Sequence, residues 1–390
     1  MTISSIGLSR ALEKDEPELA LRLFPINVEA FLNGAVAQLN AGQGSGAIAS
    51  QASSFLATHA ADARLYSLIG ETNRRAGATD EAATAFRQAL SLSKTEVTAL
   101  QWSLQRSLEQ GDVTAALDQL DVLFRRWPSR VAPLAEIVPQ VFAAVEPYQM
   151  LVARLDDNPP WRRALISALA SQPQSLAFLA RLLTDLTAGS TPPAGSELNA
   201  VLSALLKEKR YDVAYQTFIL TLTPEEQAVS GYIHNGRFQI SPTGRPFDWQ
   251  IRDHPGLTVS YPGVNGGREG GGLRVQFNNT PVRNLSLRQT LLLPSGGYAF
   301  EVTVSAQNAS LPKGLLWRIA CAGSNKVVAE APVASGTYQA MATKLMLTVP
   351  DGECPLQTLF LTTKAIGENW NDRYSGVVIF DDFRATAVGS

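Results

Sequence analysis

Aromatic and amide side chains lie close together in residues 368–374, a polar segment near the end of the chain. Trp370, Asn371 and Tyr374 belong to it, and nothing in their neighbours requires that they be buried. Aromatic rings can pack against the C–H faces of pyranose sugars, while amide and charged groups bind the hydroxyls. We therefore consider these three residues candidates for a sugar-binding rim, with ordinary packing of the loop as the alternative.

A second group of polar residues alternates with apolar ones along predicted strands, so their side chains would face away from a core. These residues are Arg274, Gln276, Arg288, Glu301 and Arg318. They could line one face of a sheet, where Arg318 and Glu301 would bind a sugar. A solvated face, or a surface on which the helical part docks, is the alternative. Trp317 and Trp249 are expected to pack in the core.

The sequence has none of the common arrangements for catalysis. No Walker loop, dinucleotide-binding glycine pattern, nucleophile elbow or HExxH motif occurs. The histidines, His59, His234 and His254, are too widely spaced to suggest a zinc site. Asp381 and Asp382 are consecutive in a predicted strand, so their carboxylates would point to opposite faces and could not act as an acid/base pair. We predict a protein that is not an enzyme and requires no cofactor.

Length and composition indicate a multidomain protein. The chain has 390 residues, 45% of them hydrophobic and 17% charged, which is typical of globular domains. A net charge of −2 gives no reason to expect binding to nucleic acid or to an anionic membrane surface. No apolar run reaches the roughly 18 residues of a membrane-spanning helix, and residues 1–10 lack the pattern of a signal peptide.

Residues 63–128 contain one helix–turn–helix pattern twice, with an offset of 34 residues that places Gly77 on Gly111. A glycine can end the first helix of each copy in a left-handed conformation. An offset of this length is the period of tetratricopeptide repeats. The first copy resembles their consensus at Tyr66, Ile69, Gly70, Gly77, Ala82, Phe86 and Ala89. We expect residues 1–228 to form a tetratricopeptide-like α-solenoid that binds a protein partner.

The composition changes after about residue 230, where glycine, proline and asparagine separate short segments of alternating apolar and polar residues. This pattern predicts an antiparallel β-sandwich, a jelly roll, over residues 229–390. The predicted strands are residues 273–277, 285–293, 298–306, 315–321, 344–349, 356–363 and 377–385. Residues 294–297 would form a tight turn between two of them.

The strand region resembles the carbohydrate-binding-module jelly rolls of the galactose-binding-like superfamily over roughly residues 231–388. The residues that carry this resemblance are 235–239 at the start of the region, 378–383 at its end, and Arg288, Gln289, Pro294 and Tyr298 between them. The resemblance implies glycan binding and, as in many such modules, a structural calcium ion between the first and last strands. Asp381 and Gln239 would be its ligands here, although an amide is a weaker calcium ligand than a carboxylate.

Helical repeats joined to such a module resemble bacterial proteins associated with exopolysaccharide production. This resemblance implies a non-catalytic scaffold, in which the repeats bind a protein and the jelly roll binds a glycan. The alternative is a structural interaction protein, whose sandwich caps the helical array without binding sugar.

The two cysteines of the chain, Cys321 and Cys354, lie beside predicted strands of one sandwich. Neighbouring backbones there can approach to the ~5.5 Å Cα separation of a disulfide, so we predict that they pair. Such a bond persists in an oxidising compartment, which favours the periplasm or cell envelope. Two buried thiols in a cytoplasmic protein are the alternative, and the lack of a visible signal peptide supports it.

Overall fold

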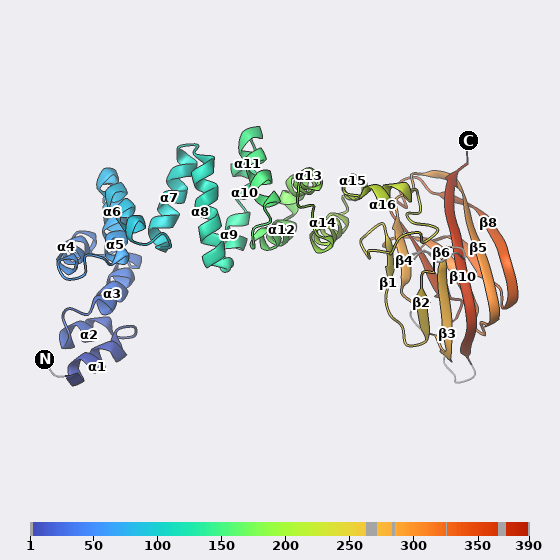
Figure 1. The fold of residues 1–390 in the computed structure, drawn as a ribbon, viewed down its shortest axis with the longest axis horizontal. Coiled ribbons are helices and arrows are strands. Elements are labelled where there is room, and N and C mark those ends of the chain that lie inside the picture. The colour runs from blue at the N-terminus through green and yellow to red at the C-terminus, as the bar shows by residue number, and fades with distance from the viewer. Residues whose placement is uncertain (1–2, 263–270, 283–284, 325, 366–371, 389–390) are drawn as a thin grey trace. The chain divides into compact units, whose positions relative to one another are not determined.

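The computed structural model describes residues 3–262, 271–282, 285–324, 326–365 and 372–388. The chain divides into two compact units, Met1–Leu165 and Ile166–Ser390, and each is described by itself (Figure 1). The boundary predicted between residues 228 and 229 lies inside the second unit, where the helices end and the strands follow. Within the described ranges, no helix is both long and apolar enough to span a membrane.

The first unit is helical. Its elements are α1 (Ile3–Leu12), α2 (Pro17–Leu23), α3 (Val28–Asn40), α4 (Ser45–Leu56), α5 (Ala63–Arg75), α6 (Thr79–Leu92), α7 (Val97–Glu109), α8 (Val113–Arg126), η1 (Pro128–Arg130), α9 (Val131–Ala135), α10 (Val138–Val141), α11 (Val145–Asp156) and the start of α12 (Arg162–Ala170). Both ends of α5 and α7 are 34 residues apart, as are both ends of α6 and α8. Gly77 and Gly111 have φ angles of 78° and 72°, which confirms the left-handed conformation predicted for them.

The two helices of the first copy approach closely at Gly70. A Cβ atom on Gly70 would lie 2.7 Å from the ring of Phe86, which is fully buried in α6. The same ring stacks on Trp102 of α7, with 4.9 Å between centroids. The small residues of the repeat pattern are therefore positioned where α5, α6 and α7 pack around one phenylalanine.

The second unit begins with helices and ends with the strands. Its helical elements are the end of α12, then η2 (Pro173–Ser175), α13 (Leu176–Thr187), α14 (Gly195–Lys207), α15 (Tyr211–Leu220) and α16 (Pro224–Ala228). The short helix α16 has a capping box: Glu226 N–H donates to Thr223 Oγ1 at 3.3 Å, and Thr223 N–H donates to Glu226 Oε2 at 2.9 Å.

The described strands form two five-stranded sheets, in which all paired strands are antiparallel. Sheet A has the order β1-β4-β9-β6-β7, and sheet B has the order β2-β3-β10-β5-β8. The strands are β1 (Trp249–Ile251), β2 (Leu257–Ser260), β3 (Leu273–Pro281), β4 (Leu287–Leu291), β5 (Gly296–Ser310), β6 (Leu315–Cys321), β7 (Val327–Val333), β8 (Gly336–Val349), β9 (Gln357–Thr363) and β10 (Arg373–Ala387).

The core of the sandwich contains an aromatic cluster between the two sheets. Trp249 and Trp317 of sheet A pack against Phe383 of sheet B, with ring centroids 5.1 Å and 4.9 Å away. Trp317 also meets Phe380 edge-on at 5.3 Å. Both tryptophans are almost completely buried, which confirms the prediction that they pack in the core.

The segment between β4 and β5 differs from its expected role. Residues 294–297 were expected to form a tight turn between two strands, but β4 lies in sheet A and β5 in sheet B. The segment therefore crosses between the sheets. The reason is that a proline- and glycine-rich turn looks the same in sequence whether it joins hydrogen-bonded neighbours or strands of opposite layers.

Candidate functional site

The polar residues expected on one sheet face are divided between two. Arg288 and Arg318 belong to sheet A, whereas Arg274, Gln276 and Glu301 belong to sheet B. Arg318 and Glu301 each alternate with buried core residues, so each points outward from its own sheet. They consequently lie on opposite faces of the sandwich and cannot contact the same sugar, which corrects the expectation of a single face.

Glu301 has a different environment from the one expected. Its carboxylate pairs with Lys344 at 2.7 Å and with Arg384 at 3.4 Å on the outer face of sheet B. The hydrogen bond from Lys344 holds the pKa of Glu301 below its ordinary value. This carboxylate is thus occupied by two cations, and no aromatic ring stands directly opposite it in either paired strand.

The predicted aromatic rim is not formed by Tyr374. Its ring is completely buried and packs on Phe277 with 5.5 Å between centroids. Its hydroxyl donates to the carbonyl oxygen of Gly314 at 2.9 Å, and burial raises the pKa of Tyr374 to about 12. The ring is therefore a packing anchor and is inaccessible to a ligand. Trp370 and Asn371 lie outside the described residues.

The outer face of sheet A carries an aromatic ring at its centre. Phe360 lies on β9, the middle strand of the sheet, between the inward-facing Leu359 and Leu361. It is directly opposite Arg288 of β4 on one side and Arg318 of β6 on the other. Directly opposed side chains on neighbouring antiparallel strands have Cβ atoms about 4.5–5.5 Å apart. One ring is thus flanked by two guanidinium groups.

This arrangement extends across the whole sheet. Arg288 is opposite Gln250 of β1, and Arg318 is opposite Glu330 of β7. The resulting line of five outward side chains, one from each strand, is called the Phe360 row: Gln250, Arg288, Phe360, Arg318 and Glu330.

The polar members of the Phe360 row hold one another in place. Arg288 Nε donates to Gln250 Oε1 at 3.0 Å. Arg318 pairs with Glu330 through Nε and Nη2, at 2.8 Å and 2.6 Å from the same carboxylate oxygen. Phe360 is half-buried, and it belongs neither to the core cluster nor, among the described residues, to any ring pair. Each arginine is thus held by the residue on its far side from Phe360, and the ring between the two arginines remains partly exposed.

Short side chains neighbour the ring along its own strand. Thr358 and Thr362 lie two residues before and after Phe360, so they share its outward face. Thr290 of β4 is directly opposite Thr358. The row can donate hydrogen bonds from guanidinium groups at the ring's edges.

The first unit has a hollow of its own on the surface of α3, α5 and α7. Its volume is about 670 Å³. Polar side chains such as Asn33, Asn40 and Gln101 line it, together with the half-buried Trp102. Val36 is 50% exposed at its edge. Charged side chains, among them Arg64, Glu71, Arg74 and Glu96, also line the hollow.

The residues predicted to bind calcium do not make a metal site by themselves. Asp381 Oδ1 accepts the backbone N–H of Asp382 at 2.7 Å, and burial raises the pKa of the Asp381 carboxyl. Gln239 is exposed, and its N–H donates to Asn235 Oδ1 at 2.9 Å. Within the described ranges, no three His, Cys, Asp or Glu side chains are grouped closely enough to hold a metal ion. Calcium binding thus stays a prediction.

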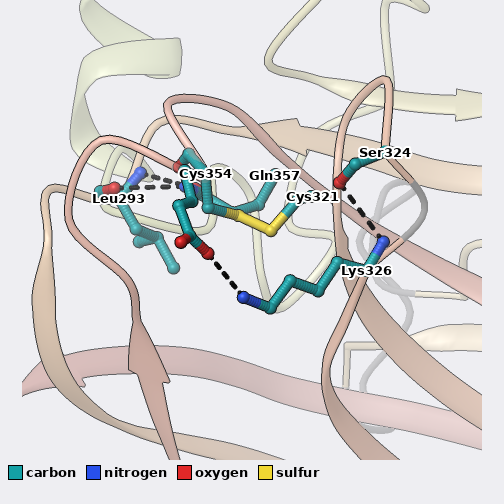
Figure 2. The surroundings of a disulfide bond; sticks show 7 residues. Leu293, Cys321, Ser324, Lys326, Cys354 and Gln357 are labelled. Carbon is teal, nitrogen blue, oxygen red and sulfur yellow. Dashed lines mark hydrogen bonds and ion pairs between the residues drawn. A yellow bond between two sulfur atoms is a disulfide. The ribbon is translucent and has the colours of Figure 1, made fainter.

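Cys321 and Cys354 form a disulfide with 5.1 Å between their Cα atoms (Figure 2). It joins the end of β6 to the segment before β9, and both cysteines are buried. Beside it, the Gln357 side chain accepts from Leu293 N–H at 2.8 Å and donates to Leu293 O at 3.3 Å. The disulfide thereby supports the two central strands of sheet A, including the strand that carries Phe360.

No family model matches the sequence, and no curated protein matches it. Solved structures of carbohydrate-binding modules are similar to the C-terminal part of the chain. A CBM4 module is 16% identical with a TM-score of 0.31, over 40% of this chain and 99% of that one. TmCBM61, in complex with β-1,4-galactotriose, is 17% identical with a TM-score of 0.27, over 41% and 99%. The CBM22-1 xylan-binding domain from Paenibacillus barcinonensis is 13% identical with a TM-score of 0.24, over 36% and 86%.

Proposed function

We propose that the β-sandwich binds a glycan on the outer face of sheet A, without catalysing a reaction. The observation that carries this proposal is the position of Phe360, which is partly exposed at the centre of the sheet and directly opposite Arg288 and Arg318. A sugar ring would stack on the phenyl ring, while the two guanidinium groups donate hydrogen bonds to its oxygens. The carboxylate within the row, Glu330, is paired with Arg318, so the row itself lacks the second carboxyl group of a glycosidase.

A substitution on the central strand of each sheet tests this proposal. Phe360→Ala should abolish retention of the full chain in gels that contain the polysaccharide it binds. Ile379→Ala is the matched control, because Ile379 lies on β10, the middle strand of sheet B, and also faces outward. It should leave retention unchanged. Equal retention of Phe360→Ala and the unchanged protein, or cleavage of the glycan by pure protein, would contradict the proposal.

For the helical part, we propose tetratricopeptide-like repeats whose hollow on α3, α5 and α7 binds a protein partner. Supporting observations are the 34-residue spacing of the paired helices and the exposed Val36 beside amide side chains. Val36→Asp should lower the yield of partner cross-linked to the protein. The control Val145→Asp, at a 65% exposed position on α11 outside the hollow, should leave that yield unchanged. A scaffold that holds a protein and a glycan together fits a role in bacterial exopolysaccharide production or export, in the periplasm or cell envelope.

A second candidate function is purely structural, with a sandwich that packs on helices and binds no sugar. Contacts inside the second unit favour it: the ring of Phe247, in the segment before β1, packs on Tyr215 and Phe218 of α15 at 5.2 Å and 5.6 Å. The two candidates differ in a glycan array with the full chain. Binding that is lost in Phe360→Ala supports the first, whereas an array without any bound glycan supports the second.

A further inference from the structure

We propose that the glycan recognised by the Phe360 row is anionic, and that Arg288 binds the carboxylate of a hexuronate unit. This inference rests on the proposed function of the same site, because it specifies the class of sugar that stacks on Phe360. The inference specifies the charge of the glycan, which stacking on Phe360 does not determine.

The charges of the Phe360 row are unequal at its two ends. Arg318 is neutralised by Glu330, since Nη2 lies 2.6 Å from the carboxylate oxygen. Arg288 instead donates to the neutral amide of Gln250 at 3.0 Å, and in the described part of the chain no carboxylate forms an ion pair with it. The row therefore has a net charge of +1, and that charge belongs to Arg288. A ligand with a carboxylate would complement it.

The geometry places that charge where a uronate carboxylate would be. The carboxylate of a hexuronate is attached to C5, at the edge of the pyranose ring. When the sugar face stacks on the phenyl ring of Phe360, its edge substituents project sideways, toward the neighbouring strands. Arg288 is directly opposite Phe360 on β4, and a guanidinium group presents two parallel N–H donors that match a carboxylate. Gln250 holds Nε, which leaves the terminal Nη groups available for the ligand.

Arg274 on sheet B provides a comparison for Arg288, because no aromatic ring lies opposite it on β10. Arg274 also donates to a neutral amide, that of Gln276 at 2.9 Å, on an outward sheet face. The residue directly opposite it on β10 is Ile379, an aliphatic residue. Arg288 and Arg274 are therefore similar in charge and in partner, and they differ in the presence of an aromatic ring. This makes Arg274 the natural control.

The experiment measures binding of the full chain to polygalacturonate and to alginate, each compared with its methyl-esterified form. The ester retains the sugar ring and removes the charge. We expect the free acid of at least one polymer to bind about tenfold or more tightly than its ester, as for a charge-assisted hydrogen bond. Arg288→Gln should weaken binding of the free acid more than binding of its ester, and so remove that preference. Arg274→Gln should change neither. Arg288→Lys, which keeps the charge and loses the planar pair of donors, should restore part of the preference.

The outcomes separate this inference from the proposed function. If neutral polysaccharides bind as tightly as polyuronates and Phe360→Ala abolishes that binding, the inference is overturned and the proposed function stands. If a sulfated galactan binds as tightly as the polyuronates, the assignment to a carboxylate is overturned. If neither acids, esters nor neutral glycans bind, both proposals fail. Unfolding midpoints of the Arg288 variants should equal that of the unchanged protein, because the Arg288 side chain is exposed, and this excludes misfolding as the cause of their lost preference.

Discussion

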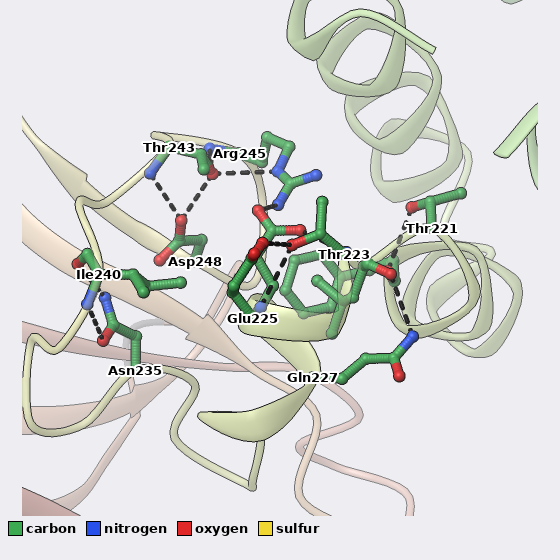
Figure 3. A network of polar contacts seen from close by, with 12 residues as sticks. Thr221, Thr223, Glu225, Gln227, Asn235, Ile240, Thr243, Arg245 and Asp248 are labelled. Atoms are coloured by element: carbon green, nitrogen blue, oxygen red, sulfur yellow. Dashed lines mark hydrogen bonds and ion pairs between the residues drawn. The ribbon is translucent and has the colours of Figure 1, made fainter. Parts of the chain in front are cut away.

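Glu226 of α16 and Arg245 of the segment before β1 form a buried ion pair inside the second unit (Figure 3). Their side chains are 11% and 6% exposed. The other carboxylate oxygen of Glu226 accepts the N–H of Thr223. Arg245 Nε donates to Thr243 Oγ1 at 3.0 Å, and the guanidinium lies 5.7 Å from the ring centroid of Phe218. One glutamate thus caps the last helix and binds the segment that leads into the sandwich.

We predict that this pair makes the last helices part of the sandwich unit. Glu226→Ala should lower the free energy of unfolding by about 3–5 kcal/mol, because it leaves the Arg245 charge buried and unpaired. Glu225→Ala is the matched control, since Glu225 is an exposed neighbour in the same helix and its loss should change stability by less than about 1 kcal/mol. Urea unfolding of residues 166–390 measures both values. Equal midpoints for the two variants would show that the pair is not needed.

In the first unit, the close approach of α5 and α6 predicts opposite effects for two glycine-to-alanine substitutions. At Gly70 the added methyl would lie 2.7 Å from the buried Phe86 ring, so Gly70→Ala should destabilise by about 1–3 kcal/mol through overpacking. Gly7 is exposed within α1, and a Cβ there meets no atom within 4 Å. Gly7→Ala should therefore be neutral or stabilise by up to about 1 kcal/mol. Thermal unfolding followed by circular dichroism would contradict this if both variants moved the midpoint in the same direction.

The sequence was most informative where a pattern reports on local geometry. The fixed offset of Gly77 and Gly111 could be found because both positions require a left-handed backbone. Strand β6 was predicted with its observed ends, because its core residues Leu315, Trp317, Ile319 and Cys321 recur at every second position. The strands β1, β2 and β7 were missed: the first two are only three and four residues long, too short for a visible alternation.

The sheet to which a strand belongs could not be predicted from the sequence. For this reason the polar residues expected on one sheet face were found on two. Arg318 and Glu301 have the same local pattern, yet their strands pair in different layers. Strand pairing depends on long-range contacts, which alternation does not encode. Phe360 carried a usable signal that was overlooked: it alternates with Leu359 and Leu361, and it therefore shares a face with two threonines. An aromatic residue on the polar face of a strand is therefore a further candidate beside Trp370, which lies outside the described residues.

A histidine at the junction of α15 and the sandwich predicts sensitivity to acid. His234 is 2% exposed, and its ring meets that of Phe218 edge-on at 5.2 Å. In the described part of the chain, neither ring nitrogen has a hydrogen-bond partner. Burial lowers the pKa of His234 below its ordinary value of 6.5. The charges of Asp248 and Glu226 act in the opposite direction, and the charge of Arg245 lowers the pKa further. The folded protein therefore keeps this ring neutral at a pH where the unfolded chain binds a proton.

The sign of the pH dependence follows from this difference. Below about pH 6.5 the unfolded state binds more protons at this position than the folded state does. The free energy of unfolding therefore decreases as the pH is lowered, by at most about 1.4 kcal/mol per pH unit, until the folded-state pKa is reached. His234→Leu should remove this slope and preserve stability at pH 7. His59→Gln, at a half-buried position in the first unit, should leave the slope unchanged. Urea unfolding between pH 5 and pH 8 measures it, and an identical slope in His234→Leu would contradict the assignment.

The disulfide between Cys321 and Cys354 predicts a stability that depends on redox conditions. The two residues are 33 positions apart, and closing a loop of this length stabilises a fold by about 3–4 kcal/mol in the chain-entropy description. Reduction should therefore lower the urea midpoint of the sandwich, and Cys354→Ser should lower it to the same value with or without reductant. Because the bond supports β9, which carries Phe360, reduction should also weaken glycan retention.

The compartment of the protein is tested by the same bond. Thiol titration of protein that is isolated and denatured without reductant should find no free thiol. That result would support our proposal of the periplasm or cell envelope, since such bonds persist where the surroundings are oxidising. Two free thiols would remove the argument for export, and the buried pair would then be an ordinary part of the sandwich core. Glycan retention that is insensitive to reductant would separate the bond from the proposed binding face.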